Sequence, residues 1–148
     1  MRKLFLITAL ATGLAIATPV AAQENAYTPG TYMTVQGIMI EDGQFENYMD
    51  YIAATYRRSQ DFARQQGWIT GYRIFSNVNP RAGEPHLYLL TESAKLATPQ
   101  EEVARERQLN TYMTQTTRQA TEQSGRRVTM RKLGSNILLQ ELNLRPAR

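Results

Sequence analysis

The chain contains 148 residues, of which 42% are hydrophobic and 20% charged, with a formal net charge of +4, no cysteine and one histidine. This length and composition predict one globular domain rather than a disordered chain. The lack of cysteine excludes disulfide scaffolds, thiol catalysis, covalent haem attachment and cysteine-rich zinc sites, and a single histidine excludes most histidine-rich metal sites.

Residues 1–22 have the pattern of a cleaved secretory signal. Arg2 and Lys3 precede an apolar run, and small residues near Ala22 place the cleavage site after it. The apolar run is shorter than the roughly 20 residues that a membrane anchor needs. Because residues 1–22 carry two basic side chains, cleavage leaves 126 residues with 15 basic and 13 acidic side chains. We therefore expect a periplasmic or secreted protein without a membrane anchor, whose single domain spans residues 23–148.

The first half of the mature chain predicts a turn, a strand and a long helix. Thr28-Pro29-Gly30 predicts a turn, and residues 31–40, rich in β-branched and aromatic side chains, predict a strand with two apolar faces. The spacing over residues 44–66 predicts an amphipathic helix that ends at Gly67. A second apolar stripe on this helix indicates an additional packing partner, and it contains Tyr51, Thr55, Arg58 and Phe62.

Two shorter strands follow, over residues 71–76 and 86–92. The loop between them, residues 77–85, contains two prolines, two asparagines and one glycine, so antiparallel pairing of its flanking strands is the simplest arrangement. Thr98-Pro99-Gln100-Glu101 then predicts the start of a helix. Thr98 caps it, Pro99 takes the first helical position, and Glu101 completes a capping box.

The C-terminal part of the chain predicts the end of this second helix and a final strand. Several threonines weaken the helix, and Gly125 is expected to end it. Residues 126–133 are expected to add one or two helical turns before Gly134. Residues 136–144 then predict a strand that is apolar on both faces.

The resulting order, β-α-β-β-α-β, predicts a ferredoxin-like α+β fold with an antiparallel sheet and both helices on one face. The other face of the sheet would be bare in a monomer, although the strands are apolar on both sides. A second copy of the chain is the usual solution, and it would form a two-sheet dimeric barrel. We therefore expect a homodimer.

Turn and packing motifs along the mature chain carry a family resemblance. They are Tyr27–Thr31, Gly67, Glu84–Leu89, Leu133–Ser135 and Gln140–Leu142. With them the chain resembles an uncharacterised group of secreted bacterial proteins in the dimeric α+β barrel superfamily, related to antibiotic-biosynthesis-monooxygenase-type domains. The resemblance implies the fold and a periplasmic location, and it implies no particular reaction.

Four residues are candidates for ligand binding: Tyr32, Tyr72, His86 and Tyr88. The tyrosines come from three predicted strands, and on a shared face they would line a pocket suited to an aromatic or apolar molecule. His86 would then be a base or ligand contact. The alternative is that the tyrosines pack in the core or a dimer interface and that backbone groups or water satisfy His86.

Other chemistries lack their motifs. The sequence has no G-x-S-x-G element, calcium loop or glycine-rich phosphate loop, so we assign no catalytic residue, metal or cofactor. The carboxylate pairs Glu41-Asp42 and Glu101-Glu102 are interpreted as parts of a turn and a helix start. The basic segment Arg126–Lys132 has no interleaved aromatic residues, so we interpret it as a solvated helix face and not as a nucleic-acid site.

The sequence favours a non-catalytic periplasmic or secreted protein that binds a small apolar or aromatic molecule in a barrel cleft. One alternative is a cofactor-independent monooxygenase or isomerase acting on an aromatic or polyketide-like substrate, in which His86 and the strand tyrosines take part. Another is a purely structural homodimer with no ligand.

Overall fold

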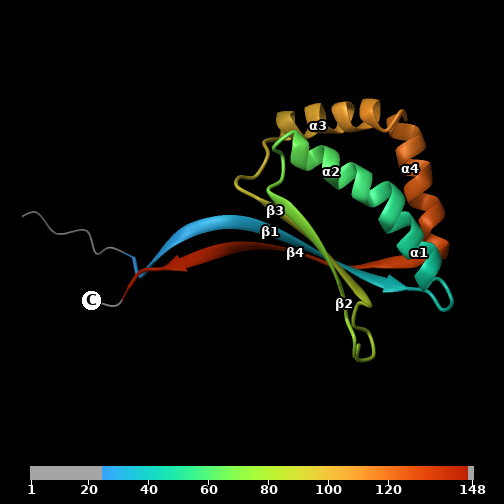
Figure 1. Cartoon of the computed structure of the whole chain (residues 1–148), viewed down its shortest axis with the longest axis horizontal. Helices are drawn as coiled ribbons and strands as arrows, with labels where there is room; N and C mark the ends of the chain where they lie inside the picture. The colour runs from blue at the N-terminus through green and yellow to red at the C-terminus, as the bar shows by residue number, and fades with distance from the viewer. Residues whose placement is uncertain (1–24, 147–148) are drawn as a thin grey trace, which may run out of the picture.

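A four-stranded antiparallel sheet and a set of helices form the structure, a computed structural model that describes residues 25–146 (Figure 1). The predicted signal, residues 1–22, lies outside the described residues. The elements in chain order are β1 (Tyr27–Ile40), α1 (Phe45–Tyr51), the π-helical segment η1 (Ile52–Tyr56), α2 (Arg57–Gln65), β2 (Gly71–Ser76), β3 (Leu87–Ser93), α3 (Pro99–Tyr112), α4 (Thr117–Arg126), the short 3₁₀ turn η2 (Arg127–Thr129) and β4 (Arg131–Leu144). The predicted α+β class and antiparallel sheet are confirmed.

The strands lie in the order β2-β3-β1-β4, and every neighbouring pair is antiparallel. In the register of β1 and β3, Ile38 is opposite Leu87, so both side chains lie on the same face of the sheet. This is the inner face, against which the helices pack. The predicted pairing of the strands at residues 71–76 and 86–92 is confirmed, with β3 beginning one residue later, at Leu87.

The core lies between the inner face and the first helix. Its buried members are Ile38, Tyr48, Ile52, Leu87 and Leu89. The predicted helix over residues 44–66 is present as the continuous run α1, η1 and α2, and its residues Tyr48 and Ile52 supply two of these five side chains. Gly67 has a φ of +69°, a left-handed conformation that glycine adopts without strain, which explains why the helix ends there.

The second stripe of the first helix contacts other parts of the same chain. The ring of Phe62 stacks on Tyr112 of α3, with centroids 4.2 Å apart, and meets Trp68 edge-on. The guanidinium of Arg127 lies 4.3 Å from the centroid of the Tyr51 ring. The additional packing partner indicated by the sequence is therefore the layer formed by α3, α4 and η2.

The second helical region begins as predicted but is broken elsewhere. Thr98 and Glu101 form the predicted capping box at the start of α3. The prediction that Gly125 ends the helix is wrong, because Gly125 lies within α4. The break comes earlier, where Thr114 has a φ of +56° and Thr116 begins α4 with a second capping box. Buried Asn110 stabilises the corner by donating a hydrogen bond to Thr117.

Both long strands exceed their predicted bounds. β1 begins at Tyr27, so the predicted turn at Thr28-Pro29-Gly30 is extended chain. Proline is tolerated there because β1 pairs only with β4 at that end and the register is irregular after Pro29. One or two helical turns were expected over residues 126–133. Only the short turn η2 is present there, because β4 begins at Arg131. Gly134 lies within β4 close to the backbone of Gly37, at another irregularity in the register.

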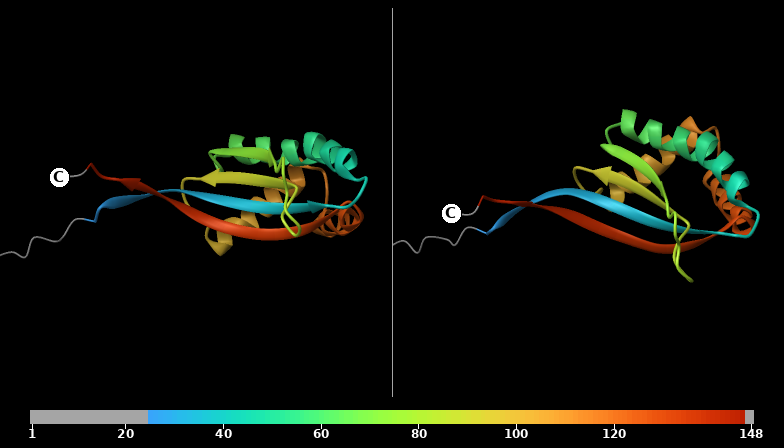
Figure 2. Two further views of the ribbon diagram at one scale, coloured as in Figure 1. Left: turned by 90° about the horizontal axis from the view of Figure 1, so that it is seen from below. Right: turned by 60° about the horizontal axis from the view of Figure 1, so that its bottom comes forward.

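The sheet face opposite the helices, here called the outer face, carries a set of apolar side chains. Two views of the ribbon show no helix of the described chain lying across it (Figure 2). The register places on this face Met33, Val35, Phe75, Tyr88, Leu90, Ile137 and Leu139. The loop before β3 reaches this side, where Pro85 packs on Gly37. The sequence expectation that both faces are apolar therefore holds, but one of them faces solvent.

β1 and β4 continue together beyond the rest of the sheet. Pairing of β1 with β3 ends at Tyr32, whereas pairing with β4 continues to Tyr27 and Leu144. Residues 27–31 and 141–144 thus form a two-stranded ribbon, here called the arm, which projects away from the helices (Figure 1). Leu144 is 81% exposed on it.

Among the described residues, no helix is long and apolar enough to cross a membrane.

Candidate functional site

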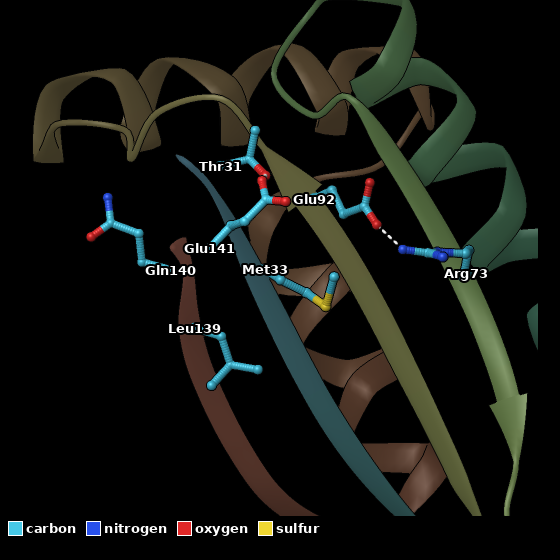
Figure 3. A pocket seen from close by; sticks show the side chains of 7 residues that line it. All are labelled: Thr31, Met33, Arg73, Glu92, Leu139, Gln140 and Glu141. Carbon is cyan, nitrogen blue, oxygen red and sulfur yellow. Dashed lines mark hydrogen bonds and ion pairs between the residues drawn. The ribbon is translucent and has the colours of Figure 1, made fainter. Parts of the chain in front are cut away.

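A hollow of about 440 Å³ lies on the outer face, at the base of the arm (Figure 3). Its lining combines arm residues with residues of all four strands, namely Thr31, Met33, Arg73, Glu92, Leu139, Gln140 and Glu141. Met33 and Leu139 are direct partners in the β1–β4 register, so their side chains lie next to each other on this face. They form an apolar floor within a polar rim. This volume is within the range of small-molecule sites.

The rim contains one ion pair and one additional carboxylate. Arg73 of β2 forms an ion pair with Glu92 of β3. The carboxylate of Glu141 accepts a hydrogen bond of 3.2 Å from the hydroxyl of Thr31, and no cation of the described chain lies within ion-pair distance of it. Gly30 makes room for this carboxylate, since a Cβ there would lie 2.7 Å from its Oε2.

The three tyrosines predicted to bind a ligand do not share one face of the sheet. Tyr32 and Tyr72 lie on the inner face, whereas Tyr88 lies on the outer face, opposite Gly37 and Phe75. Neither the hollow at the arm nor a second hollow beside α3 includes any of the four candidate residues. The condition on which the aromatic-pocket hypothesis depended, a shared face, is therefore not met by the three tyrosines.

His86 connects β1 to the start of β3. Its Nδ1 accepts a hydrogen bond of 2.8 Å from the backbone N–H of Ile40, and its own backbone N–H donates to the carbonyl of Ile38. The imidazole thus satisfies a backbone donor at the irregular end of β1. Of the two interpretations drawn from the sequence, the geometry favours the structural one.

We expect His86→Ala to lower the free energy of unfolding by about 1–2 kcal/mol, because the half-buried N–H of Ile40 loses its acceptor. His86→Asn places an amide oxygen near the position of Nδ1 and should recover at least half of that loss. Urea denaturation of both variants measures the difference. Equal losses in the two variants would show that packing, and not the hydrogen bond, is what His86 contributes.

Tyr72 is bonded to the first helix. Its hydroxyl donates a hydrogen bond of 3.0 Å to the carboxylate of Asp61, and its ring meets that of Tyr56 edge-on. Burial and the neighbouring Asp61 carboxylate raise the pKa of Tyr72 above its usual value. Burial also raises the pKa of Tyr56. Both hydroxyls are protonated near neutral pH, and that of Tyr72 joins β2 to α2 through Asp61.

The second hollow, about 480 Å³, lies between α2, α3 and the inner face. Trp68 and Leu109 contribute apolar surface to it, and Arg105 and Glu106 contribute charge. The guanidinium of Arg105 already lies 5.8 Å from the centroid of the Trp68 ring, and Glu106 accepts a hydrogen bond from Thr117. The ring of Trp68 in this second hollow is thus already in contact with the guanidinium of Arg105.

The interpretation of the basic segment as a solvated helix face is wrong for Arg131. This residue is only 7% exposed and lies over the ring of Tyr48, because the strand β4 begins there and points its side chain to the inner face. Arg126 and Lys132 form ion pairs with Glu122 and Glu41. The four basic residues of the segment thus all have contacts within the chain.

The comparisons with known proteins add no assignment. No protein-family model, curated protein or solved structure matches the chain. Within the described residues, no cluster of three or more histidine, cysteine, aspartate or glutamate side chains could hold a metal ion.

Sequence reasoning missed the residues of this hollow. Met33, Leu139 and Glu141 belong to strands that were predicted, but their common position depends on the register between residues about a hundred positions apart. The available signal was the alternation in β4, where Ile137, Leu139 and Glu141 share a face. That alternation places a carboxylate in line with two apolar residues.

Proposed function

We propose that the chain forms a homodimer through its outer face and that the hollow at the arm, closed between the two sheets, binds a small molecule with an apolar body. The observation that carries this proposal is the apolar outer face, which no helix of the described chain covers (Figure 2). Phe75, Ile137 and Leu139 are each nearly half exposed there, at 47%, 46% and 48%. An exposed apolar patch of this kind typically marks an interaction surface.

A second copy is the proposed partner because the arm and the outer face are continuous on one side of the molecule. A two-stranded ribbon is marginally stable in water by itself, and Leu142 and Leu144 on the arm are exposed. Two copies related by a two-fold axis would each cover the patch of the other. Completing the burial of one such half-exposed side chain contributes about 1 kcal/mol, so several of them on each copy support a stable association.

The arrangement proposed for each copy is ferredoxin-like, and the dimer is a barrel of two facing sheets. The strand order β2-β3-β1-β4 with antiparallel neighbours supports this arrangement, as does the covering of only one face by helices. The resemblance noted in the sequence supports it independently. In such a dimer the hollow would lie between the sheets, shielded from water.

The dimer is tested with the variant Ile137→Glu, which places a charge in the middle of the proposed interface. We expect the mature wild-type protein to sediment as a dimer at micromolar concentration and the variant to sediment as a monomer. Val103→Glu is the matched control, because Val103 is 50% exposed on α3, in the helix layer, and this variant should stay dimeric. A monomeric wild-type protein would refute the interface.

The proposed location is the periplasm or the exterior of the cell. It follows from residues 1–22, which lie outside the described residues, and from the sequence pattern there. The intact mass of the exported protein tests this directly, since cleavage after Ala22 leaves a chain that begins at Gln23.

A further inference from the structure

We infer that the hollow at the arm selects molecules that carry a positively charged amine on an apolar body, with Glu141 receiving the ammonium group. This inference rests on the proposed function and names its ligand class. Three features of the hollow support this ligand class: the charges on its rim, the loss of water from these charges in a dimer, and its apolar floor.

The rim of the hollow carries one surplus negative charge. Arg73 and Glu92 neutralise each other in their ion pair (Figure 3). Glu141 contacts the hydroxyl of Thr31, a neutral group, and forms no ion pair with any described residue. An ammonium group would give Glu141 a charged partner, which none of the described residues provides.

Covering the outer face would make this partner more favourable. A carboxylate that loses water without gaining a cation costs several kcal/mol, which would oppose dimer formation. The basic strand residues of the outer face, Arg73 and Lys132, already pair with Glu92 and Glu41. A second copy therefore brings no unpaired cation from the described strand residues of its outer face, and a cationic ligand is the partner that we propose for Glu141.

The apolar floor of the hollow determines which uncharged group the ligand carries beside its amine. Met33 and Leu139 present adjacent apolar side chains beneath the rim. Methionine adapts to irregular shapes, so the floor accepts a short alkyl chain or a small ring without one fixed outline. With a volume of about 440 Å³, the hollow is large enough for such a group together with its amine.

The inference is tested with three probes of equal chain length: hexylammonium, 1-hexanol and hexanoate. Binding is followed by NMR of methyl-labelled methionine, with Met33 reporting on the hollow and Met113, at the end of α3, serving as a distant reference. We expect hexylammonium to bind about tenfold more tightly than hexanol, because opposite charges attract in addition to the hydrogen bond, and hexanoate to bind most weakly, because like charges repel.

Glu141→Gln should remove the preference for hexylammonium over hexanol, because the amide keeps an acceptor oxygen and removes the negative charge. Glu46→Gln is the matched control, since it removes one exposed carboxylate from α1, and it should keep the tenfold preference. Equal binding of the three probes, tightest binding of hexanoate, an unshifted Met33 signal or an unchanged preference in Glu141→Gln would each overturn the inference. Sedimentation of the same samples separates the two proposals, because a monomer that keeps the preference refutes only the dimer.

Discussion

Replacing Tyr48 with alanine is expected to lower the free energy of unfolding by about 3–5 kcal/mol, the usual cost of removing a buried aromatic side chain. Tyr48 is 2% exposed and belongs to the core cluster that joins α1 to β1 and β3. A domain of this size is stable by only about 5–15 kcal/mol, so the variant should be close to unfolding. Urea denaturation followed by circular dichroism measures the loss.

Phe45→Ala is the control for Tyr48→Ala, because Phe45 lies on the same helix but is 41% exposed. It should cost less than about 1.5 kcal/mol. Comparable losses in the two variants would mean that burial does not distinguish these positions and that the core has been assigned wrongly.

The same tyrosine predicts a loss of stability at alkaline pH. Burial raises the pKa of Tyr48 above 10.0, and the charge of Arg131 opposes part of this rise. Because the folded protein then holds the hydroxyl proton more tightly than the unfolded chain does, this stabilisation is complete below pH 10 and is lost as the pH rises through the folded pKa. Tyr48→Phe cannot ionise, so its urea midpoint should fall less steeply than that of the wild type above pH 10.

The second large effect is expected at Arg131, whose two substitutions should act in opposite directions. Its guanidinium lies 5.9 Å from the centroid of the Tyr48 ring, its Nε has no hydrogen-bond partner, and no described carboxylate pairs with it. Arg131→Ala removes the buried aliphatic stem and should cost about 2 kcal/mol. Arg131→Met keeps most of that volume and removes the unpaired charge, so its stability should equal or exceed that of the wild type by about 1 kcal/mol.

Thermal and urea denaturation of both Arg131 variants measure these effects, with Arg118→Met as a control for loss of an exposed arginine on α4. A methionine variant as unstable as the alanine variant would show that the attraction between the cation and the Tyr48 ring outweighs the cost of burying the charge. Arg131 would then stabilise the fold through its charge and not only through its aliphatic stem.

Side-chain roles were harder to predict than secondary structure. His86 and the strand tyrosines were chosen for their chemistry, but only the paired backbones place Tyr88 on the face opposite Tyr32 and Tyr72. The residue types were compatible with both a pocket and a packed core. The face that each side chain occupies decides between them, and it depends on a register that a single-residue shift would invert.

The sequence by itself determined the elements whose signals are local. The capping box at Thr98, the helix end at Gly67 and the antiparallel strands around residues 77–85 depend on neighbouring residues, and all are present. It also indicated that the strands were apolar on both sides.

Only the tertiary structure decided which apolar side stayed open and where the hollow formed. The extension of β1 and β4 into an arm and the burial of Arg131 both arise from contacts distant in sequence. Such contacts depend on how the strands pair and how the helices cross them. Local propensity carries no information on either, because the residues involved meet only after the chain has folded.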